Sequence, residues 1–218
     1  MPDLTFTVED ARPLTPAVSP HLAFKLAIST DARDSTADAI HCVMLQSQIR
    51  IEPARRRYND EEQDGLFDLF GEPDRWGQTL RGMLWTHCAI TVPAFTGRTT
   101  VDLPVPCTYD FNVAATKYFD ALRDGEVPLD FLFSGTTFYS HDGMLRIAPI
   151  AWDKEASFRL PVQVWRRMMD QHYSNAAWLC LRKDVFERLY RYKSRRALPT
   201  WEQALDSLLA QAGEPTLR

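Results

Sequence analysis

This 218-residue chain lacks the sequence signals of several common protein classes. No apolar run approaches the ~20 residues that a helix needs to span a bilayer. The first residues, MPDLTFTVEDARPL, contain acids and no apolar segment typical of a secretory signal. The net charge is −4, so the chain also lacks the basic excess usual in broad nucleic-acid binding. We therefore expect a cytoplasmic protein with no membrane span and no nucleic-acid partner.

The short motifs of common catalytic chemistry are absent as well. There is no phosphate-binding glycine loop, no dinucleotide-binding glycine pattern, no nucleophile-elbow serine and no H-E-x-x-H zinc motif. Carboxylates are plentiful, but no pair stands in an apolar setting that would move its pKa values apart. We accordingly expect no catalytic residue and no cofactor, and hence a protein that is not an enzyme.

Cysteines are few and scattered. The four are Cys42, Cys88, Cys107 and Cys180, and no two have the C-x-x-C spacing. Without a secretory signal, reduced and buried thiols are the default expectation. Cys107 stands near Asp110, whose charge would raise the thiol pKa rather than lower it, so a packed thiol is favoured over a nucleophile.

Two His-Cys dipeptides give the one pattern compatible with a metal site. They are His41-Cys42 and His87-Cys88, both within strand-like segments. Because neighbours on a strand point to opposite faces, at most one residue of each dipeptide can face a shared site. Structural zinc normally needs four ligands. Core cysteines beside partly exposed histidines are therefore favoured, and a metal-binding protein or enzyme using these four residues remains an alternative.

Alternation of apolar and polar residues predicts most of the chain to be strand. Strand patterns cover residues 4–8, 22–28, 39–51, 84–94, 99–105 and 129–139, with a short one at 177–181. Helical patterns cover about 59–70, 113–122, 161–172, 184–195 and 200–209. The predicted fold class is α+β, with a largely antiparallel sheet and packed helices. A sandwich-like arrangement of the sheet is one of the arrangements that the pattern allows. We expect the sheet core with two or three helices in residues 1–152 and a helical portion packed on it in residues 153–218, together one domain.

Several expectations concern which strand residues face the core. In the strand at 39–51, His41 shares one face with the apolar residues that alternate after it. In the strand at 84–94, Leu84 points inward. The strand at 99–105 returns as the hairpin partner of 84–94, and its two prolines confine it to an edge.

Other expectations concern single turns and helix ends. Gly135 interrupts the most apolar strand, which indicates a bulge or a close backbone approach. Asp184 with Glu187 resembles a capping box that starts a helix, and Thr200 with Gln203 repeats this device for the last helix.

An arginine triplet is the first candidate for binding a partner. Arg55, Arg56 and Arg57 are suited to binding phosphate or an acidic protein. Acids follow directly at residues 60–64, however, and offer local counter-charge, so a solvated and self-compensated surface is favoured. Trp76 and Trp85 are candidate interface anchors, for which core packing is an equally good explanation.

A basic segment near the C-terminus is the strongest of these candidates. Residues 182–196 hold seven Lys or Arg and two acids, a net charge of +5, and the aromatic residues among them indicate a basic amphipathic helix. A surface helix whose aromatic stripe packs in the core is the plainer alternative. The candidate partner-binding residues here are Arg188, Arg191, Lys193, Arg195 and Arg196.

Longer stretches of the chain resemble a known family. The segments RIEPARRRY, LFGEPDRWGQTLRGMLWTH, DLPVPCTYDF, KYFDALRDGEVPLDFLFSGTTFY and YKSRRALPTW together resemble a bacterial domain-of-unknown-function family often encoded near NiFe-hydrogenase genes. The resemblance extends over nearly the whole chain. It implies a non-enzymatic accessory or assembly role through protein–protein contact, with hydrogenase subunits or maturation factors as partners. It transfers no catalytic residue.

A second resemblance concerns the fold. The segment CTYDFNVAATKYFDALRDGEVPLDFLFSGTTF is similar to the SecB-type export chaperone around a sheet-to-helix junction and the proline-rich strand that follows. It implies, as an alternative, a chaperone that binds unfolded or exported chains. The long helical tail departs from that family.

Overall fold

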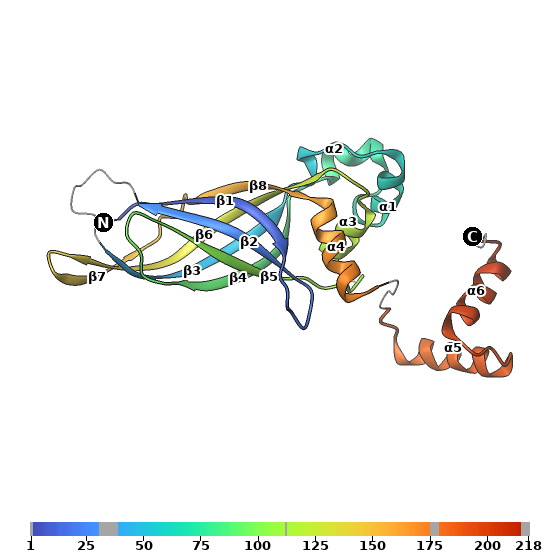
Figure 1. The fold of residues 1–218 in the computed structure, drawn as a ribbon. Helices are drawn as coiled ribbons and strands as arrows, with labels where there is room; N and C mark the ends of the chain where they lie inside the picture. Colours follow the sequence, from blue (N-terminus) through green and yellow to red (C-terminus); the bar gives the residue numbers. More distant parts are fainter. Residues whose placement is uncertain (1, 31–38, 112, 175–178, 215–218) are drawn as a thin grey trace. The chain divides into compact units, whose positions relative to one another are not determined.

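The computed structural model divides the chain into two compact units, which we name the β unit (residues 1–177) and the helical unit (residues 178–218). It describes residues 2–30, 39–111, 113–174 and 179–214 (Figure 1). The fold is α+β, as the sequence predicts, with two antiparallel sheets in the β unit. Among the described residues, no helix combines the length and hydrophobicity that a transmembrane span requires.

The eight described strands form two sheets that share one core. The three-stranded sheet has the order β1 (Leu4–Pro13), β2 (His21–Thr30), β5 (Arg98–Pro106). The five-stranded sheet consists of β4 (Met83–Val92), β3 (Ile40–Ile51), β6 (Glu126–His141), β7 (Met144–Pro149) and β8 (Glu155–Pro161). Phe6 of β1 stacks on Phe133 of β6 at 4.4 Å between ring centroids, and Phe24 of β2 meets Phe131 at 5.1 Å. The inner faces thus pack as in a sandwich.

Helices gather at one end of the sheets, opposite the end where β7 lies (Figure 1). They are η1 (Pro53–Arg55), α1 (Asp60–Phe70), η2 (Pro73–Arg75), α2 (Trp76–Thr79), α3 (Ala114–Ala121) and α4 (Val162–His172). α1 begins with a capping box between Asn59 and Glu62 and ends at Gly71. It packs on α3, whose Tyr118 and Phe119 are buried.

Strand β8 lies beyond residue 152, the predicted end of the sheet core. It pairs with β6 over Glu126–Leu132, and β7 pairs with the same strand over Thr136–His141. The turn between β6 and β7 has two residues, Asp142 and Gly143, both with positive φ (51° and 73°). That turn is typical of a tight hairpin.

A β-bulge makes one predicted face of β3 wrong. In its pairing with β6, Ile40 lies opposite Tyr139 and Cys42 opposite Phe138, so His41 is the extra residue. The bulge shifts the alternation by one position, since successive strand residues point to opposite faces. Ile40 is therefore buried and His41 is exposed, the reverse of the expected arrangement.

A second bulge makes the expectation for Leu84 wrong. Opposite β4, Ile49 pairs with Thr86 and Arg50 with Leu84, so Trp85 is the extra residue. Leu84 is 51% exposed. Trp85 instead packs against Phe119, with ring centroids 4.8 Å apart.

Strand β5 does not pair with β4 as a hairpin, contrary to expectation. It pairs with β2 along its whole length, and Phe24 lies opposite Leu103. The chain passes from the five-stranded sheet to the three-stranded sheet at residues 95–97. Phe95 forms a bridge with Ile40 next to the first sheet, whereas the Gly97 carbonyl accepts the Thr30 amide of the second. The edge position expected from the prolines of β5 is confirmed, because β5 is the last strand of its sheet.

The helical unit contains α5 (Lys183–Arg195) and α6 (Trp201–Ala212). The predicted capping box at Asp184 is wrong, because α5 begins one residue earlier and Asp184 lies inside its first turn. Thr200 does cap α6, accepting the Gln203 amide at 3.2 Å. Of the strand predicted at 177–181, the first two residues lie outside the described ones, and 179–181 form no strand.

Candidate functional site

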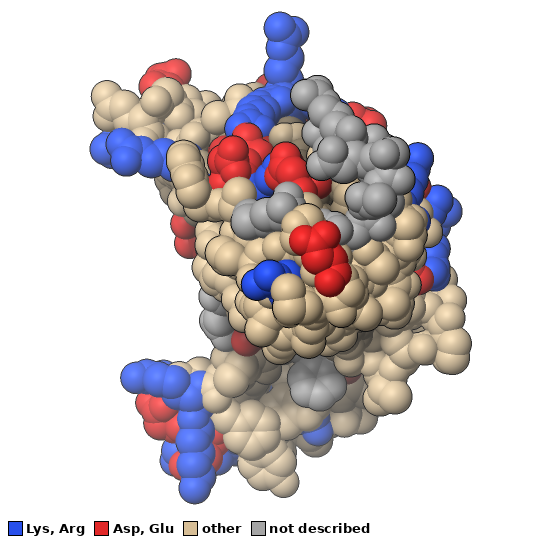
Figure 2. All heavy atoms as spheres, turned by 90° about the vertical axis from the view of Figure 1, so that its left-hand side faces the viewer, with Lys and Arg blue, Asp and Glu red and all other residues tan. Residues whose placement is uncertain are grey.

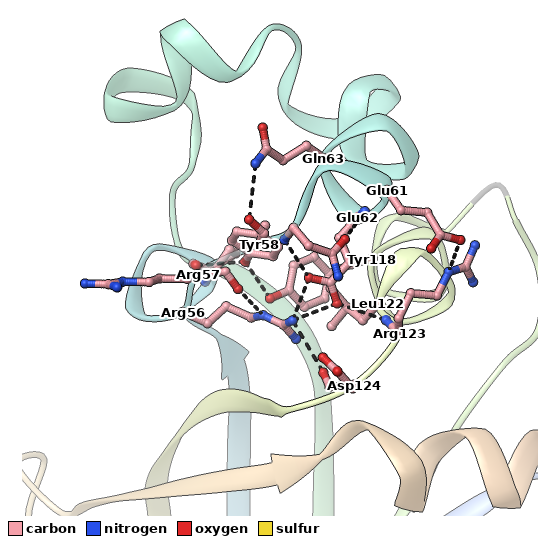
Figure 3. Close-up of polar contacts among 12 residues, drawn as sticks. Arg56, Arg57, Tyr58, Glu61, Glu62, Gln63, Tyr118, Leu122, Arg123 and Asp124 are labelled. Atoms are coloured by element: carbon pink, nitrogen blue, oxygen red, sulfur yellow. Dashed lines mark hydrogen bonds and ion pairs between the residues drawn. The ribbon is translucent and has the colours of Figure 1, made fainter.

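The three side chains of the arginine triplet have different surroundings. Arg55 donates to Asp130 of β6 at 2.8 Å. Arg56 turns inward, and its side chain is only 7% exposed. Arg57 is exposed and points away from Arg56 (Figure 3), so the triplet does not form one cationic surface.

Glu62 of α1 is the centre of a buried polar network. Its side chain is 2% exposed and accepts from Arg56 Nη2 at 2.8 and 3.0 Å. The same carboxylate accepts the backbone amides of Asn59 at 3.3 Å and Arg123 at 2.9 Å. It thereby connects the segment after η1, the start of α1 and the link from α3 to β6 (Figure 3). Charge-assisted hydrogen bonds of this kind are among the stronger ones in proteins.

Two tyrosines extend this network into the core. Tyr58 donates its hydroxyl to the Pro53 carbonyl at 2.8 Å and lies 2.8 Å from the Tyr118 hydroxyl. The Arg56 guanidinium lies 4.9 Å from the Tyr58 ring centroid, a cation–π contact. Burial raises the pKa of Tyr118 to about 12 and raises that of Tyr58 as well, so both hydroxyls remain protonated at neutral pH.

An open depression of about 900 Å³ lies beside this network. Four arginines and three acids line it, and Arg55 and Arg56 already have carboxylate partners. Arg57 and Arg159 face the same depression as Asp124 and Glu126. Opposite charges thus compensate locally, which agrees with the self-compensated surface favoured from the sequence rather than with a phosphate site.

The two candidate tryptophan anchors of the β unit lie within its packing. Trp76 donates its indole N–H to the Gly71 carbonyl at 2.9 Å and meets the Tyr58 ring edge-on at 5.3 Å. Trp85 packs on Phe119, as described above. Core packing, the second explanation offered by the sequence, accounts for both rings.

The two His-Cys dipeptides lie far apart along their strands. Cys88 of β4 is opposite Ser47 of β3, five positions from Cys42, which corresponds to ~16 Å along a strand. His41 lies 2.7 Å from the Ser140 hydroxyl instead. No three His, Cys, Asp or Glu side chains are grouped for a metal ion anywhere in the described ranges. The metal alternative therefore gains no geometric support.

Burial disfavours the thiolate form of two cysteines in the β unit, Cys88 and Cys107. Burial raises the pKa of Cys107 to about 12 and that of Cys88 to about 11. Burial, rather than the charge of Asp110, is thus the main cause at Cys107.

Aromatic side chains of the helical unit gather on its surface. Phe186 and Tyr190 of α5 lie 5.3 and 6.2 Å from Trp201 of α6, measured between ring centroids. Phe186 is 45% exposed and Tyr190 54% exposed. These three rings, with Glu187 and Arg191, line an apolar slot of about 440 Å³. We call it the aromatic slot.

Four of the predicted basic residues come together beside the aromatic slot. Arg188, Arg191, Arg195 and Arg196 line a second depression of about 350 Å³, which we call the arginine groove. Arg191 belongs to both. The fifth predicted residue, Lys193, lies over the Trp201 ring at 5.5 Å. The sequence analysis did not identify Trp201 as part of this surface, although the sequence shows that it directly follows a proline-containing turn.

The β unit also has an exposed apolar area, near β7. Met144, Leu145 and Ile147 of β7 are exposed, as is Trp152. β7 pairs only with β6 among the described strands, so its other edge is open. Seen from that end, uncharged residues make up most of the surface (Figure 2).

Comparison with known proteins gives one match, which covers residues 1–216. The chain belongs to the family of unknown function DUF6084. The predicted membership of a domain-of-unknown-function family is thereby confirmed. The family description names no activity, and nothing in the comparisons links the chain to hydrogenase or to SecB. No curated protein and no solved structure matches the chain.

Proposed function

We propose that this chain is a non-enzymatic accessory protein that acts by contact with another protein. The observation that carries the proposal is the exposed apolar surface of the helical unit. α5 has no buried residue, and α6 buries only Ala204 among its described residues. Leu205, Leu208 and Leu209 are exposed, as are Phe186 and Tyr190.

This unit spans residues 178–218, close to the lower size limit for a chain that completes a core of its own. Chains below about 40 residues usually need disulfides, metals or association to be stable. The helical unit holds Cys180 as its one cysteine, and that thiol is free and exposed. Contact with another protein surface would bury the apolar side chains that the two helices leave in water. Phe, Tyr, Trp and Arg are also the residues enriched at protein interfaces.

The partner that we propose is a subunit or maturation factor of a NiFe hydrogenase. This choice is supported by the family resemblance of segments such as LFGEPDRWGQTLRGMLWTH and YKSRRALPTW. The geometry of the helical unit supports protein contact in general and does not select among partners.

Affinity purification of the tagged full chain tests this proposal. In cells that oxidise hydrogen, wild-type bait is expected to recover hydrogenase subunits or maturation factors. The Leu209→Glu and Tyr190→Glu variants, each on an exposed side chain, are expected to recover roughly tenfold less, as for loss of an interface hot spot. Met44→Glu, on an exposed side chain of β3, is the matched control and should behave as wild type. Recovery of no hydrogenase component contradicts the choice of partner. Equal recovery by all baits contradicts the claim that the exposed surface of the helical unit makes the contact.

A chaperone that binds unfolded chains is a second candidate, favoured by the exposed apolar residues near β7. If it is correct, the full chain will suppress light scattering from a denatured, aggregating client enzyme at about equimolar ratio. The Leu145→Ser, Ile147→Ser double variant will then lose this effect, while Leu84→Ser will keep it. Undiminished aggregation in the presence of the wild-type chain would exclude the candidate.

A further inference from the structure

We infer that the helical unit recognises an acidic protein segment that carries one large apolar anchor. The aromatic slot would take the anchor, and the arginine groove would take the carboxylates next to it. This inference rests on the proposed function and specifies the chemistry of the partner.

The aromatic slot has the shape and lining suited to one apolar side chain. Three rings, Phe186, Tyr190 and Trp201, converge on it from two helices. Aromatic rings bury large areas and pack preferentially edge-on or offset with other rings. A Phe, Trp or Leu side chain entering the slot would cover the rings that α5 and α6 leave half exposed.

The arginine groove has cations without counter-charges. Among the described residues, no ion pair is formed by Arg188, Arg191, Arg195 or Arg196. Arg191 donates to the Glu187 carbonyl, and Arg196 lies 5.0 Å from the Tyr192 ring centroid, so neither contact neutralises the guanidinium. Like charges held close together repel, and carboxylates are the groups that the planar guanidinium fork matches.

The charge of the helical unit is opposite to that of the rest of the chain. Residues 178–218 hold eight Lys or Arg and five acids, a net charge of +3. Residues 1–177 hold 17 Lys or Arg and 24 acids, a net charge of −7. The basic character is thus concentrated in the unit that also exposes the aromatic slot, which favours an acidic occupant through charge complementarity.

The geometry favours a protein segment over a lipid surface or a nucleic acid. A membrane-binding helix presents one continuous apolar face with cations at its margins. Here the rings instead form a concave slot between two helices, and the arginine groove is a separate depression that shares Arg191 with it. Nucleic-acid binding usually comes with a broad basic surface, whereas this chain has a net charge of −4.

Fluorescence anisotropy with the full chain and a labelled peptide tests the inference. The probe is a peptide of about 15 residues with one central Phe as the apolar anchor and Glu at most other positions; a counterpart has Lys in place of Glu. The acidic peptide is expected to bind and the basic one not. The Arg191→Glu, Arg195→Glu variant should weaken binding roughly tenfold or more, and raised salt should weaken wild-type binding.

A control with the same charge change isolates the arginine groove. Arg182→Glu with Lys183→Glu alters two cations of the same unit that line neither depression, and it should bind the acidic peptide nearly as wild type does. Tyr190→Glu should lose binding through the aromatic slot.

Four results would overturn the inference. The first is that the acidic peptide does not bind at millimolar concentration, and the second is that both peptides bind equally. The third is that both double variants lose binding equally. The fourth is that the chain binds phosphatidylglycerol vesicles or single-stranded DNA in place of the acidic peptide. Concentration-dependent self-association of the chain that the Arg191→Glu, Arg195→Glu variant abolishes would instead assign the surface to a second copy. If Leu209→Glu loses the cellular partner while the groove variant keeps it, the proposed function stands and this inference fails.

Discussion

Replacing Glu62 with alanine is expected to destabilise the β unit by about 3–5 kcal/mol, because it leaves the buried Arg56 guanidinium without its counter-charge. Two backbone amides, those of Asn59 and Arg123, lose their acceptor in the same variant. Urea denaturation followed by tryptophan fluorescence measures the change as a lower midpoint at similar slope.

The neighbouring Glu61 provides the control for this prediction. Glu61 accepts from Arg123 at 2.7 Å, but on the exposed surface. Glu61→Ala is therefore expected to cost no more than about 1 kcal/mol. A double variant, Arg56→Met with Glu62→Leu, should recover much of the loss, since an apolar pair removes the unpaired charge. Equal losses for Glu61→Ala and Glu62→Ala would show that the buried pair does not stabilise the fold as we describe.

Gly135→Ala is expected to destabilise the β unit by about 3 kcal/mol or more, because the backbone there tolerates no side chain. Gly135 has φ +134°, a conformation that costs other residues roughly 1–3 kcal/mol. In addition, a Cβ at this position would lie 2.0 Å from the Met44 carbonyl oxygen of β3. The two strands would have to separate where they are hydrogen-bonded, at the centre of the five-stranded sheet.

Gly77→Ala is the matched control for the effect of the added methyl group. Gly77 lies in α2 and does not have positive φ, and a Cβ added there would meet no described atom within 4 Å beyond its own helix and chain neighbours. Its replacement should leave stability unchanged or raise it slightly. Both variants are compared by thermal melting and by soluble yield. Similar melting temperatures for the two would refute the close approach at Gly135.

The predictable part of the fold is the part that depends on local pattern. Alternation located the main strands, and the close approach at Gly135 followed from residue type. The two wrong faces both arise at bulges, where His41 and Trp85 are extra residues. A bulge is defined by pairing with a distant strand, so the periodicity of one strand does not reveal it.

Long-range pairing explains the other differences. The hydrophobic alternation of residues 99–105 does not specify a partner strand. In the structure the chain passes from one sheet to the other at Phe95 and Gly97, and residues 98–106 then pair with β2. The local pattern of the arginine triplet likewise does not show that Arg56 is buried. That depends on Glu62, which the capping box of α1 positions.

The candidate site was predicted in part. The basic residues of α5 and of its C-cap were identified from composition, and four of them line the arginine groove. The aromatic slot was not predicted, because it forms only when the turn before Trp201 brings α6 against Phe186 and Tyr190. The amphipathic pattern of α5 alone does not indicate that the Trp201 ring of α6 packs beside it.

The protein-contact function is tested most directly by site-specific crosslinking in living cells. A photo-activatable phenylalanine analogue replaces Tyr190 in the full chain, and a second strain carries it at Gln46, an exposed position on β3. During growth on hydrogen, we predict a crosslink from position 190 to a hydrogenase subunit or maturation factor and none from position 46. The absence of a protein crosslink at position 190, or the same crosslinks from both positions, would contradict the proposed function.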